Sequence, residues 1–357
     1  MQTLYRALLV GTGSVADSHA RAVEDSRGRV TLVAAADVDA DRVRAFCARQ
    51  RVPAAYTDWR EALAASRPDI VLVAAPPALH VEISLAAMAA GAWVLCEKPL
   101  CASLADLDRL AAAETATGCC TACVFQQRFA SSTAHLRRLA AEGLLGRPLV
   151  AVCHTLWFRD GAYYAVPWRG KWATEFGGPT MGLGIHAMDH LLHLLGDWAE
   201  VRAQAATLDR AVEVEDVSMA MIRFASGALA SVVNSALSPR QETYLRLDFQ
   251  RATIELTHLY GYTRDNWKLT LAQAWQHFPP DTGSTHAAQL AAFVADLDAR
   301  RRPLTSGDDA RRTLELLTAL YKSALTGRPV ARGEIVPGDP FYASLHGGGT
   351  PRLAPSR

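Results

Sequence analysis

Lysine is scarce in this chain, and one of its lysines stands in a short motif that could transfer a proton. The four are Lys98, Lys171, Lys268 and Lys322, and Lys98 follows an apolar run in WVLCEKPL. A base near a secondary alcohol takes the hydroxyl proton as a hydride leaves, and its acid form protonates the alkoxide in the reverse reaction. His186, in FGGPTMGLGIHAMD, is the other candidate. The structural alternatives are an ion pair for Lys98 and a backbone-bonded helix start for His186.

A glycine-rich turn near the N-terminus predicts where a dinucleotide binds. The run RALLV leads into GTGSVA at residues 11–16, and a helical stretch begins at once. Gly11 allows the tight turn, Gly13 lets the backbone approach a pyrophosphate, and Ala16 keeps the helix close to the strand. Ser14 and Val15 complete the turn, so we expect them in the same site.

An acidic residue at the end of the next apolar run favours NAD. Asp37 follows VTLVAAA, 21 residues past Ala16. A carboxylate at this place accepts hydrogen bonds from the adenosine ribose hydroxyls and repels a 2'-phosphate. NAD is therefore the expected cofactor, with NADP left open. Capping of the following helix is a compatible second role for Asp37.

Two later strand ends supply groups for the nicotinamide half of the cofactor. The prolines of AAPPALH end one strand, which predicts Pro76 and His80 beside the cofactor. Glu97 and Lys98 come out at the tip of the next run, so we expect both there as well.

The elements that carry these motifs alternate between apolar runs and Ala- and Leu-rich helical stretches. This texture is typical of strands buried on both faces of a parallel sheet. It predicts an α/β fold, with a doubly wound Rossmann domain over residues 1–124.

After Phe125 one helix precedes many alternating strand-like runs, such as VSMAMIRF and ALASVVNSA. They predict an α+β domain over 125–330 with a large, open-faced, mostly antiparallel sheet. Helical stretches at 286–300 and 308–325 are expected to close that domain. The Pro- and Gly-rich residues 331–357 are expected to form an extended arm.

Taken together, the motifs resemble the Gfo/Idh/MocA family, the glucose-fructose oxidoreductase and inositol dehydrogenase group. The matching stretches, in the family's order, are GTGSVA, PPALH, AAGAWVLCEKPL, QQRF, EGLLGRP, YYAVPWRGKW, FGGPTMGLGIHAMD and VEDVSMAMIRFASGALA. The resemblance implies sugar, cyclitol or related substrates and an open sheet that commonly mediates dimers or tetramers. It maps the family's motif Lys onto Lys98 and its motif His onto His186.

The chain departs from the family's dehydrogenase pattern at one position. An Asp usually stands four residues before the motif His, and this chain has Gly182 there. A glycine cannot orient or polarise a neighbouring group. The choice of general base therefore stays open between Lys98 and His186.

Aromatic and polar residues before the His motif predict a sugar-type pocket. In AYYAVPWRGKW, Tyr163 and Arg169 are expected to face the ligand, because aromatic faces stack on sugar rings and Arg binds hydroxyls or a carboxylate. Trp168 and Trp172 are expected to pack the domain junction. The other candidate substrate contacts are Arg128 of QQRF and Asp189 of HAMDHL.

Two groups of residues suggest a metal, and both lack a full ligand set. His186 and His190 share a helix face, but no third ligand accompanies them. Cys119, Cys120 and Cys123 are interpreted as small apolar residues entering a buried strand. We therefore predict no metal site.

Composition narrows the partners and the compartment. Acidic and basic residues number 36 and 37, for a net charge of +1, which leaves no electrostatic footprint for nucleic acid. No window approaches the ~18 apolar residues of a membrane span. Seven scattered cysteines are the opposite of a secreted disulfide framework. We expect a cytoplasmic homodimer or homotetramer with a small-molecule partner.

These observations predict an NAD-dependent dehydrogenase or reductase. It would move a hydride between nicotinamide and a secondary alcohol or ketone of a sugar, cyclitol or glycoside. One alternative is a glycosidase or epimerase-like enzyme that retains NAD and oxidises its substrate transiently. The second is a non-enzymatic nucleotide-sensing regulator, for which Gly182 is the only support.

Overall fold

The chain divides into two compact units in this computed structural model, which describes residues 3–258, 263–270, 282–349 and 353. The first unit comprises Met1–Cys101, Asp106–Val124 and Thr285–Ala310. The second comprises Ala102–Ala105, Phe125–Ser284 and Arg311–Arg357.

The first unit holds a six-stranded sheet in the order β3-β2-β1-β4-β5-β6, with every pair parallel. Its strands are β1 (Tyr5–Val10), β2 (Val30–Ala36), β3 (Ala55–Tyr56), β4 (Ile70–Val73), β5 (Trp93–Cys96) and β6 (Thr121–Cys123). The central strands read as unbroken apolar runs because both of their faces are buried. This order is that of a doubly wound sheet, so the predicted Rossmann fold is confirmed.

Helices α2 and α3 of the first unit begin at aspartate caps. The Asp39 side chain accepts hydrogen bonds from the backbone N–H of Asp41 and Arg42 at the start of α2, and Asp58 caps α3 in the same way. The helices are α1 (Ala16–Asp25), α2 (Ala40–Gln50), α3 (Trp59–Ser66), α4 (His80–Ala89), α5 (Leu104–Thr117) and α10 (His286–Asp298), with a short η1 (Pro77–Leu79) before α4.

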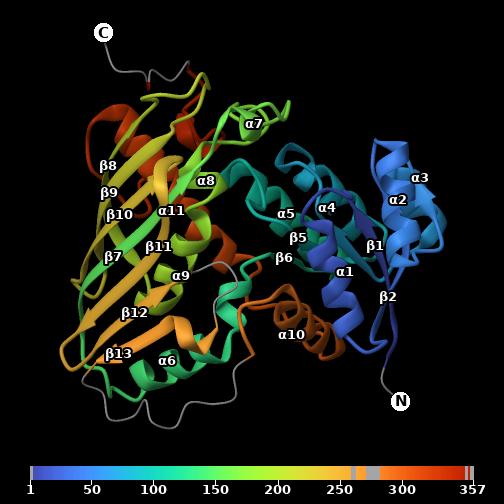
Figure 1. Cartoon of the computed structure of the whole chain (residues 1–357), viewed down its shortest axis with the longest axis horizontal. Helices are drawn as coiled ribbons and strands as arrows, with labels where there is room; N and C mark the ends of the chain where they lie inside the picture. Colours follow the sequence, from blue (N-terminus) through green and yellow to red (C-terminus); the bar gives the residue numbers. More distant parts are fainter. Residues whose placement is uncertain (1–2, 259–262, 271–281, 350–352, 354–357) are drawn as a thin grey trace. The chain divides into compact units, whose positions relative to one another are not determined.

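Helix α10 was predicted to close the second domain, and the structure assigns it to the first unit instead (Figure 1). It packs against α1. Near its end Asp298 accepts hydrogen bonds from Tyr5 (2.8 Å) and Arg29 (2.6 Å). At its first turn Gln289 donates to the Cys123 carbonyl at 2.7 Å. Chain order misled the prediction, because these partners lie more than 160 residues away in sequence.

The second unit holds an eight-stranded sheet in the order β13-β12-β11-β7-β10-β9-β8-β14. Its strands are β7 (Pro148–Phe158), β8 (Trp198–Ala206), β9 (Val217–Phe224), β10 (Leu229–Ser235), β11 (Leu237–Phe249), β12 (Thr253–Thr257), β13 (Trp267–Thr270) and β14 (Val330–Ala331). The β7–β10 pair is parallel and the other described pairs are antiparallel. The predicted large, mostly antiparallel sheet is confirmed.

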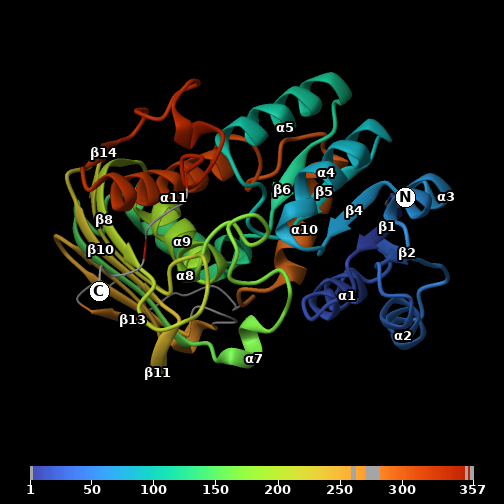
Figure 2. The ribbon, with the colours of Figure 1, turned by 90° about the horizontal axis from the view of Figure 1, so that it is seen from above.

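Buried and exposed residues alternate along β9, so the sheet has one covered and one open face. Helices α8, α9 and α11 lie on the covered face (Figures 1 and 2). The unit's helices are η2 (Gln126–Phe129), α6 (Ser131–Ala141), α7 (Gly161–Tyr164), α8 (Pro179–Gly182), α9 (Ile185–Leu195), η3 (Arg264–Asn266), α11 (Asp308–Thr326) and η5 (Pro340–Tyr342).

The described part of the expected C-terminal arm is folded against this unit. Lys322 of α11, almost fully buried, pairs with Asp339 at 2.5 Å and with Glu334 at 2.9 Å. Leu345 is buried as well. Charge pairing thus ties the proline- and glycine-rich segment to α11.

Candidate active site

Four strand ends meet at one edge of the parallel sheet in the first unit. Val10 lies opposite Ala36 on one side and opposite Val73 on the other, and Val73 lies opposite Cys96. Because all four strands run the same way, the segments that follow them emerge at the same edge. This edge therefore gathers the glycine turn, Asp37, Pro76 and Lys98, and carboxyl edges of such sheets are where ligands bind.

The glycine turn is shaped both by its neighbour strand and by open space. A Cβ on Gly11 would stand 2.4 Å from the Ala74 carbonyl oxygen, and Gly11 has a φ of +94°, so this position requires glycine. A Cβ on Gly13 would meet no described atom within 4 Å. Helix α1 begins at the fully buried Ala16, behind the exposed Ser14 and half-buried Val15. The turn is tight on the protein side and open on the side where a pyrophosphate would lie.

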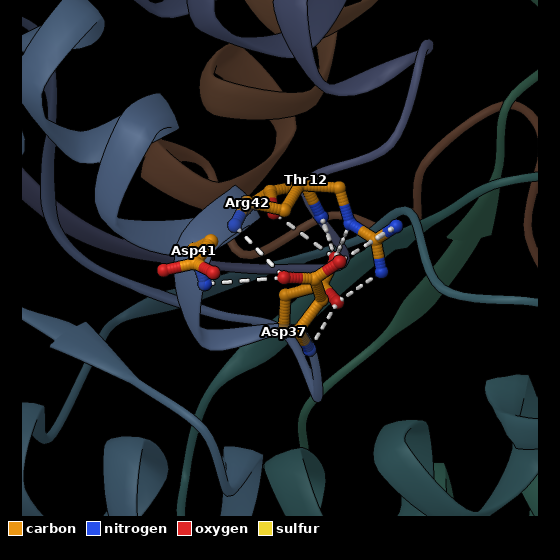
Figure 3. A network of polar contacts seen from close by, with 5 residues as sticks. Thr12, Asp37, Asp41 and Arg42 are labelled. Atoms are coloured by element: carbon orange, nitrogen blue, oxygen red, sulfur yellow. Dashed lines mark hydrogen bonds and ion pairs between the residues drawn. The ribbon is translucent and has the colours of Figure 1, made fainter.

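Asp37 sits at the centre of a polar network beside this turn (Figure 3). One of its oxygens accepts hydrogen bonds from the Thr12 backbone N–H at 2.8 Å and from the Thr12 hydroxyl at 3.0 Å. Arg42 binds both carboxylate oxygens, at 3.1 and 2.6 Å. Burial opposes ionisation, but the bonds from Arg42 and Thr12 hold the pKa of Asp37 below its ordinary value.

Arg42 was not among the predicted site residues, although its place in the first turn of α2 is a local signal. Its side chain is half exposed, whereas that of Asp37 is nearly buried. The guanidinium therefore remains accessible beside the position expected for the ribose.

His80 was predicted to contact the cofactor, and the structure gives it two backbone partners instead. Its ring nitrogens lie 2.7 Å from the Pro99 carbonyl and 2.9 Å from the Ala75 carbonyl, and the side chain is buried. Burial lowers the pKa of His80, against the pull of the two carbonyls. His80 thus ties the segment after β4 to the segment after β5, and Pro76, in the first of these segments, is exposed.

Glu97 was likewise predicted at the cofactor, and it is held by two histidines of its own unit. One carboxylate oxygen lies 3.1 Å from His19 Nε2 and 3.0 Å from His286 Nε2. Burial favours the neutral acid, but these two bonds hold the pKa of Glu97 well below its ordinary value. The other oxygen faces the backbone N–H of Lys98 at 3.4 Å.

The same three side chains could also hold a metal ion, because their ligand atoms lie within 4.8 Å of one another. Sequence reasoning missed this cluster. Residues 19 and 286 lie far apart in the chain, and α10 had been placed in the other domain. The two histidines hold Glu97, whose other oxygen faces the backbone of the half-buried Lys98.

In the second unit, His186 opens α9 behind a turn packed against the unit's own residues. A Cβ on Gly184 would stand 1.9 Å from Asn234 Oδ1, and one on Gly178 would stand 1.7 Å from the Glu215 carbonyl oxygen. His186 is buried, with its ring edge-on to Phe125 at 6.1 Å. Gly178 and Gly184 of the motif are therefore required by packing.

Glu215 anchors the start of this turn. Its carboxylate accepts hydrogen bonds from the backbone N–H of Gly178 (3.0 Å) and Thr180 (3.1 Å) and from the Tyr321 hydroxyl (3.0 Å). Burial raises the pKa of Glu215 against the effect of these donors. Phe176, just before the turn, has a φ of +69°, which for a bulky residue costs roughly 1–3 kcal/mol. The surrounding contacts hold the turn in this strained form.

Arg128 and Asp189 were predicted to bind substrate, and they pair with each other instead. Arg128 donates to both carboxylate oxygens of Asp189, at 2.8 and 2.6 Å. The two side chains are 0% and 1% exposed, and Thr313 adds a hydrogen bond to Asp189 at 2.7 Å. This buried pair joins η2, α9 and α11. Sequence reasoning missed it because the partners lie 61 residues apart.

Tyr163 and Arg169, the other predicted substrate residues, lie together. Arg169 donates to the Tyr163 hydroxyl, and its guanidinium lies 3.8 Å from the centre of the Tyr163 ring. It also donates to Glu175 at 3.0 Å. Trp172 is buried and donates from its indole N–H to the Glu213 carbonyl at 3.0 Å, as a packing residue would.

The histidines that follow His186 on α9 are occupied by neighbours in the same unit. His190 lies 3.1 Å from the Thr133 hydroxyl and packs edge-on against Trp267. Burial, followed by the charge of Arg128, lowers the pKa of His190 to about 3. Burial and nearby arginines lower the pKa of His193 to about 2.

Comparison with known families accounts for both units. Residues 5–125 match the oxidoreductase family with an NAD-binding Rossmann fold, and residues 133–257 match the GFO/IDH/MocA C-terminal domain. The chain belongs to the GFO/IDH/MocA family. It is accordingly an oxidoreductase with an NAD-binding domain, as the sequence predicted.

Two relatives and one solved structure match this GFO/IDH/MocA chain over nine-tenths or more of its length. D-glucoside 3-dehydrogenase of Escherichia coli is 27% identical, over 91% of this chain and 97% of the relative. Myo-inositol 2-dehydrogenase of Thermotoga maritima is 26% identical, over 92% and 98%. The WlbA dehydrogenase of Chromobacterium violaceum, solved with NADH and UDP-GlcNAcA, is 26% identical with a TM-score of 0.84, over 94% and 98%.

Two further observations concern membrane spans and cysteines. In the ranges that the structure describes, no helix is long and apolar enough to span a bilayer. All seven cysteines lie in those ranges and are free thiols, and six of them are buried. Cys119 lies just before β6 and Cys123 is its last residue, and both are buried, as the sequence indicated.

Proposed function

We propose that this protein transfers a hydride between NAD and a secondary hydroxyl or keto group of a sugar, cyclitol or glycoside. The observation that carries the proposal is the single sheet edge that gathers the glycine turn, Asp37 and Lys98. Relatives named for D-glucoside and myo-inositol oxidation support the substrate class. Lys98 lies in the first unit and His186 in the second.

The residues at this edge fit the cofactor. The space over Gly13 and the start of α1 suit a pyrophosphate, and Asp37 suits the ribose hydroxyls. NAD held by these residues would supply the hydride acceptor for oxidation and the hydride donor for reduction. Arg42 keeps the Asp37 carboxylate ionised and ready to accept hydrogen bonds.

We assign proton transfer to Lys98 and orientation of the reacting oxygen to His186. Lys98 is half-buried, and Glu97 beside it is held by two histidines. Glu97 faces the Lys98 backbone N–H at 3.4 Å, so the backbone from which the lysine side chain extends is restrained by a held carboxylate. His186 is buried against Phe125, which suits orientation better than exchange of protons with solvent.

The test is NADH formation at 340 nm across a panel of sugars, cyclitols and glycosides. We expect Lys98→Met to lower kcat at least about 100-fold, with NADH binding retained. Lys268→Met, at an exposed lysine of β13, serves as the matched control and should retain activity. Full activity in both Lys98→Met and His186→Gln would remove the assignment.

The comparisons favour neither alternative function. An NAD-retaining glycosidase would keep its cofactor through desalting and form no net NADH. A nucleotide-sensing regulator would turn over no sugar of the panel. The same assay therefore separates all three.

The open face of the eight-stranded sheet is proposed to bind a second copy of this chain as a homodimer. Met219, Met221 and Leu229 are 56–66% exposed on neighbouring strands, and Val150 is 49% exposed beside Leu229. Such an apolar patch marks an interaction surface. Light scattering should give twice the chain mass, and Met221→Glu should lower it to the monomer value.

We place the enzyme in the cytoplasm. Seven free thiols fit a reducing compartment better than an oxidising one. Fractionation of the native host would test this placement.

A further inference from the structure

Gly182, where the family's dehydrogenase pattern carries an Asp, lies beside the carboxylate of Glu175, seven residues earlier in the chain. A Cβ built on Gly182 would stand 3.5 Å from Glu175 Oε1. No other described atom beyond its chain neighbours and local helix backbone lies within 4 Å of that point. By standard bond lengths, the oxygens of an aspartate at 182 would lie about 2.4 Å from its Cβ. The Glu175 oxygen is therefore about 1 Å farther from that Cβ than an aspartate's own oxygens would be.

The Glu175 carboxylate is buried and firmly held. Its side chain is 5% exposed. One oxygen accepts a hydrogen bond from Arg169 at 3.0 Å, and the other accepts one from the Gly170 backbone N–H at 2.6 Å. Such charge-assisted bonds favour the ionised carboxylate and fix its direction. Burial, followed by the charge of Glu175, raises the pKa of Tyr163, which contacts the same arginine.

The backbone between Glu175 and Gly182 is also fixed. The Phe176 backbone is in the left-handed region, and a Cβ on Gly177 would stand 2.1 Å from the Tyr321 hydroxyl. Tyr321 and the Gly178 N–H are both bonded to Glu215. The placement of Glu175 next to Gly182 is thus set by contacts on both sides of the turn.

We propose that Glu175 supplies, from across the turn, the carboxylate that the family motif carries at position 182. It acts as a positioning residue for the reacting groups at the His186 motif, and this role rests on the proposed function. Glycine at 182 complements it, because a second carboxylate there would face a like charge at close range.

The kinetic test moves the carboxylate from position 175 to position 182. Glu175→Gln keeps the shape and removes the charge, so we expect kcat to fall about 100-fold, with the KM for NAD unchanged. Gly182→Asp alone should also lower kcat. The double variant Glu175→Gln/Gly182→Asp should regain at least tenfold over Glu175→Gln. A double variant no faster than the single one would overturn the proposal.

Glu114 offers a matched control in the first unit. It is 4% exposed, pairs with Arg302 at 2.9 Å and accepts a backbone N–H from Thr121 at 2.8 Å. Glu114→Gln should thus lose a similar set of contacts and keep kcat within about twofold. An equal kcat loss at both positions would reduce Glu175 to a structural role.

A thermal-unfolding cycle tests the placement without any substrate. Gly182→Asp should lower Tm more when residue 175 is Glu than when it is Gln, because only the first pair repels. Additive Tm shifts would overturn the proposal even if no substrate is found. Coupled shifts in a protein that oxidises no sugar would uphold the placement and remove the proposed function instead.

Discussion

Each unit builds a glycine-rich turn, and the two turns use glycine for opposite purposes. At Gly13 of the first unit, an added Cβ would meet nothing. At Gly178 and Gly184 of the second unit, it would collide with Glu215 or Asn234. One turn leaves room for a ligand, and the other is filled by its own chain. A glycine pattern alone therefore does not locate a ligand until the neighbours of the turn are known.

Gly178→Ala should give the largest effect, because the new Cβ would stand 1.7 Å from a backbone oxygen that cannot turn away. We expect the free energy of unfolding to fall by at least about 3 kcal/mol, measured by denaturant titration. Gly161→Ala, where the Cβ would meet open space, is the control and should change it by less than about 1 kcal/mol. Equal losses of unfolding free energy at both sites would contradict the contrast between packed and open glycines.

Acid should lower the free energy of unfolding of the second unit, because His190 and His193 stay neutral in the folded state. Their pKa values of about 3 and about 2 lie below the ordinary 6.5. Below pH 6.5 the unfolded chain binds more protons, so stability should fall by about 1.4 kcal/mol per pH unit for each histidine. Denaturant titrations from pH 7 to 5 would measure this slope. His190→Asn and His193→Gln should each make this slope smaller. Slopes equal to that of the unsubstituted protein would contradict the effect of histidine burial.

Gly13→Ala should leave the fold intact and weaken cofactor binding. The position has open space and no left-handed backbone, so Tm of the cofactor-free protein should not fall. The added methyl group would stand where the pyrophosphate approaches, raising the Kd for NADH about 10- to 100-fold by fluorescence titration, or about 1.4–2.7 kcal/mol. Unchanged affinity would mean that the turn does not hold the cofactor.

Asp37→Ser should give the smallest effect, a change of preference between two cofactors. Removing the carboxylate releases Arg42 to face a 2'-phosphate. We expect NADH affinity to fall about tenfold, or about 1.4 kcal/mol, and NADPH affinity to rise. Asp37→Ser/Arg42→Ala should lose the NADPH gain. If it does not, Arg42 has no part in the choice.

The sequence predicted what depends on neighbouring residues. The strand runs, the glycine turn and Asp37 were recognised because each follows a local pattern, and the fold class followed from their order. The pairing of Arg128 with Asp189 and the two histidines at Glu97 were missed. Each depends on which distant segments fold together, and a polar residue on its own does not reveal whether its partner is a ligand or another side chain.

The place of helix α10 in the chain affects the order in which the first unit can be completed during synthesis. The first unit takes Asp298 for its hydrogen bonds to Tyr5 and Arg29, and Gln289 for its bond to the end of β6. During synthesis these residues leave the ribosome after the Phe125–Ser284 part of the second unit. Although domains commonly fold from the N-terminus onward, the first unit here is complete only once this late helix has been made. A fragment ending at residue 124 would lack that helix.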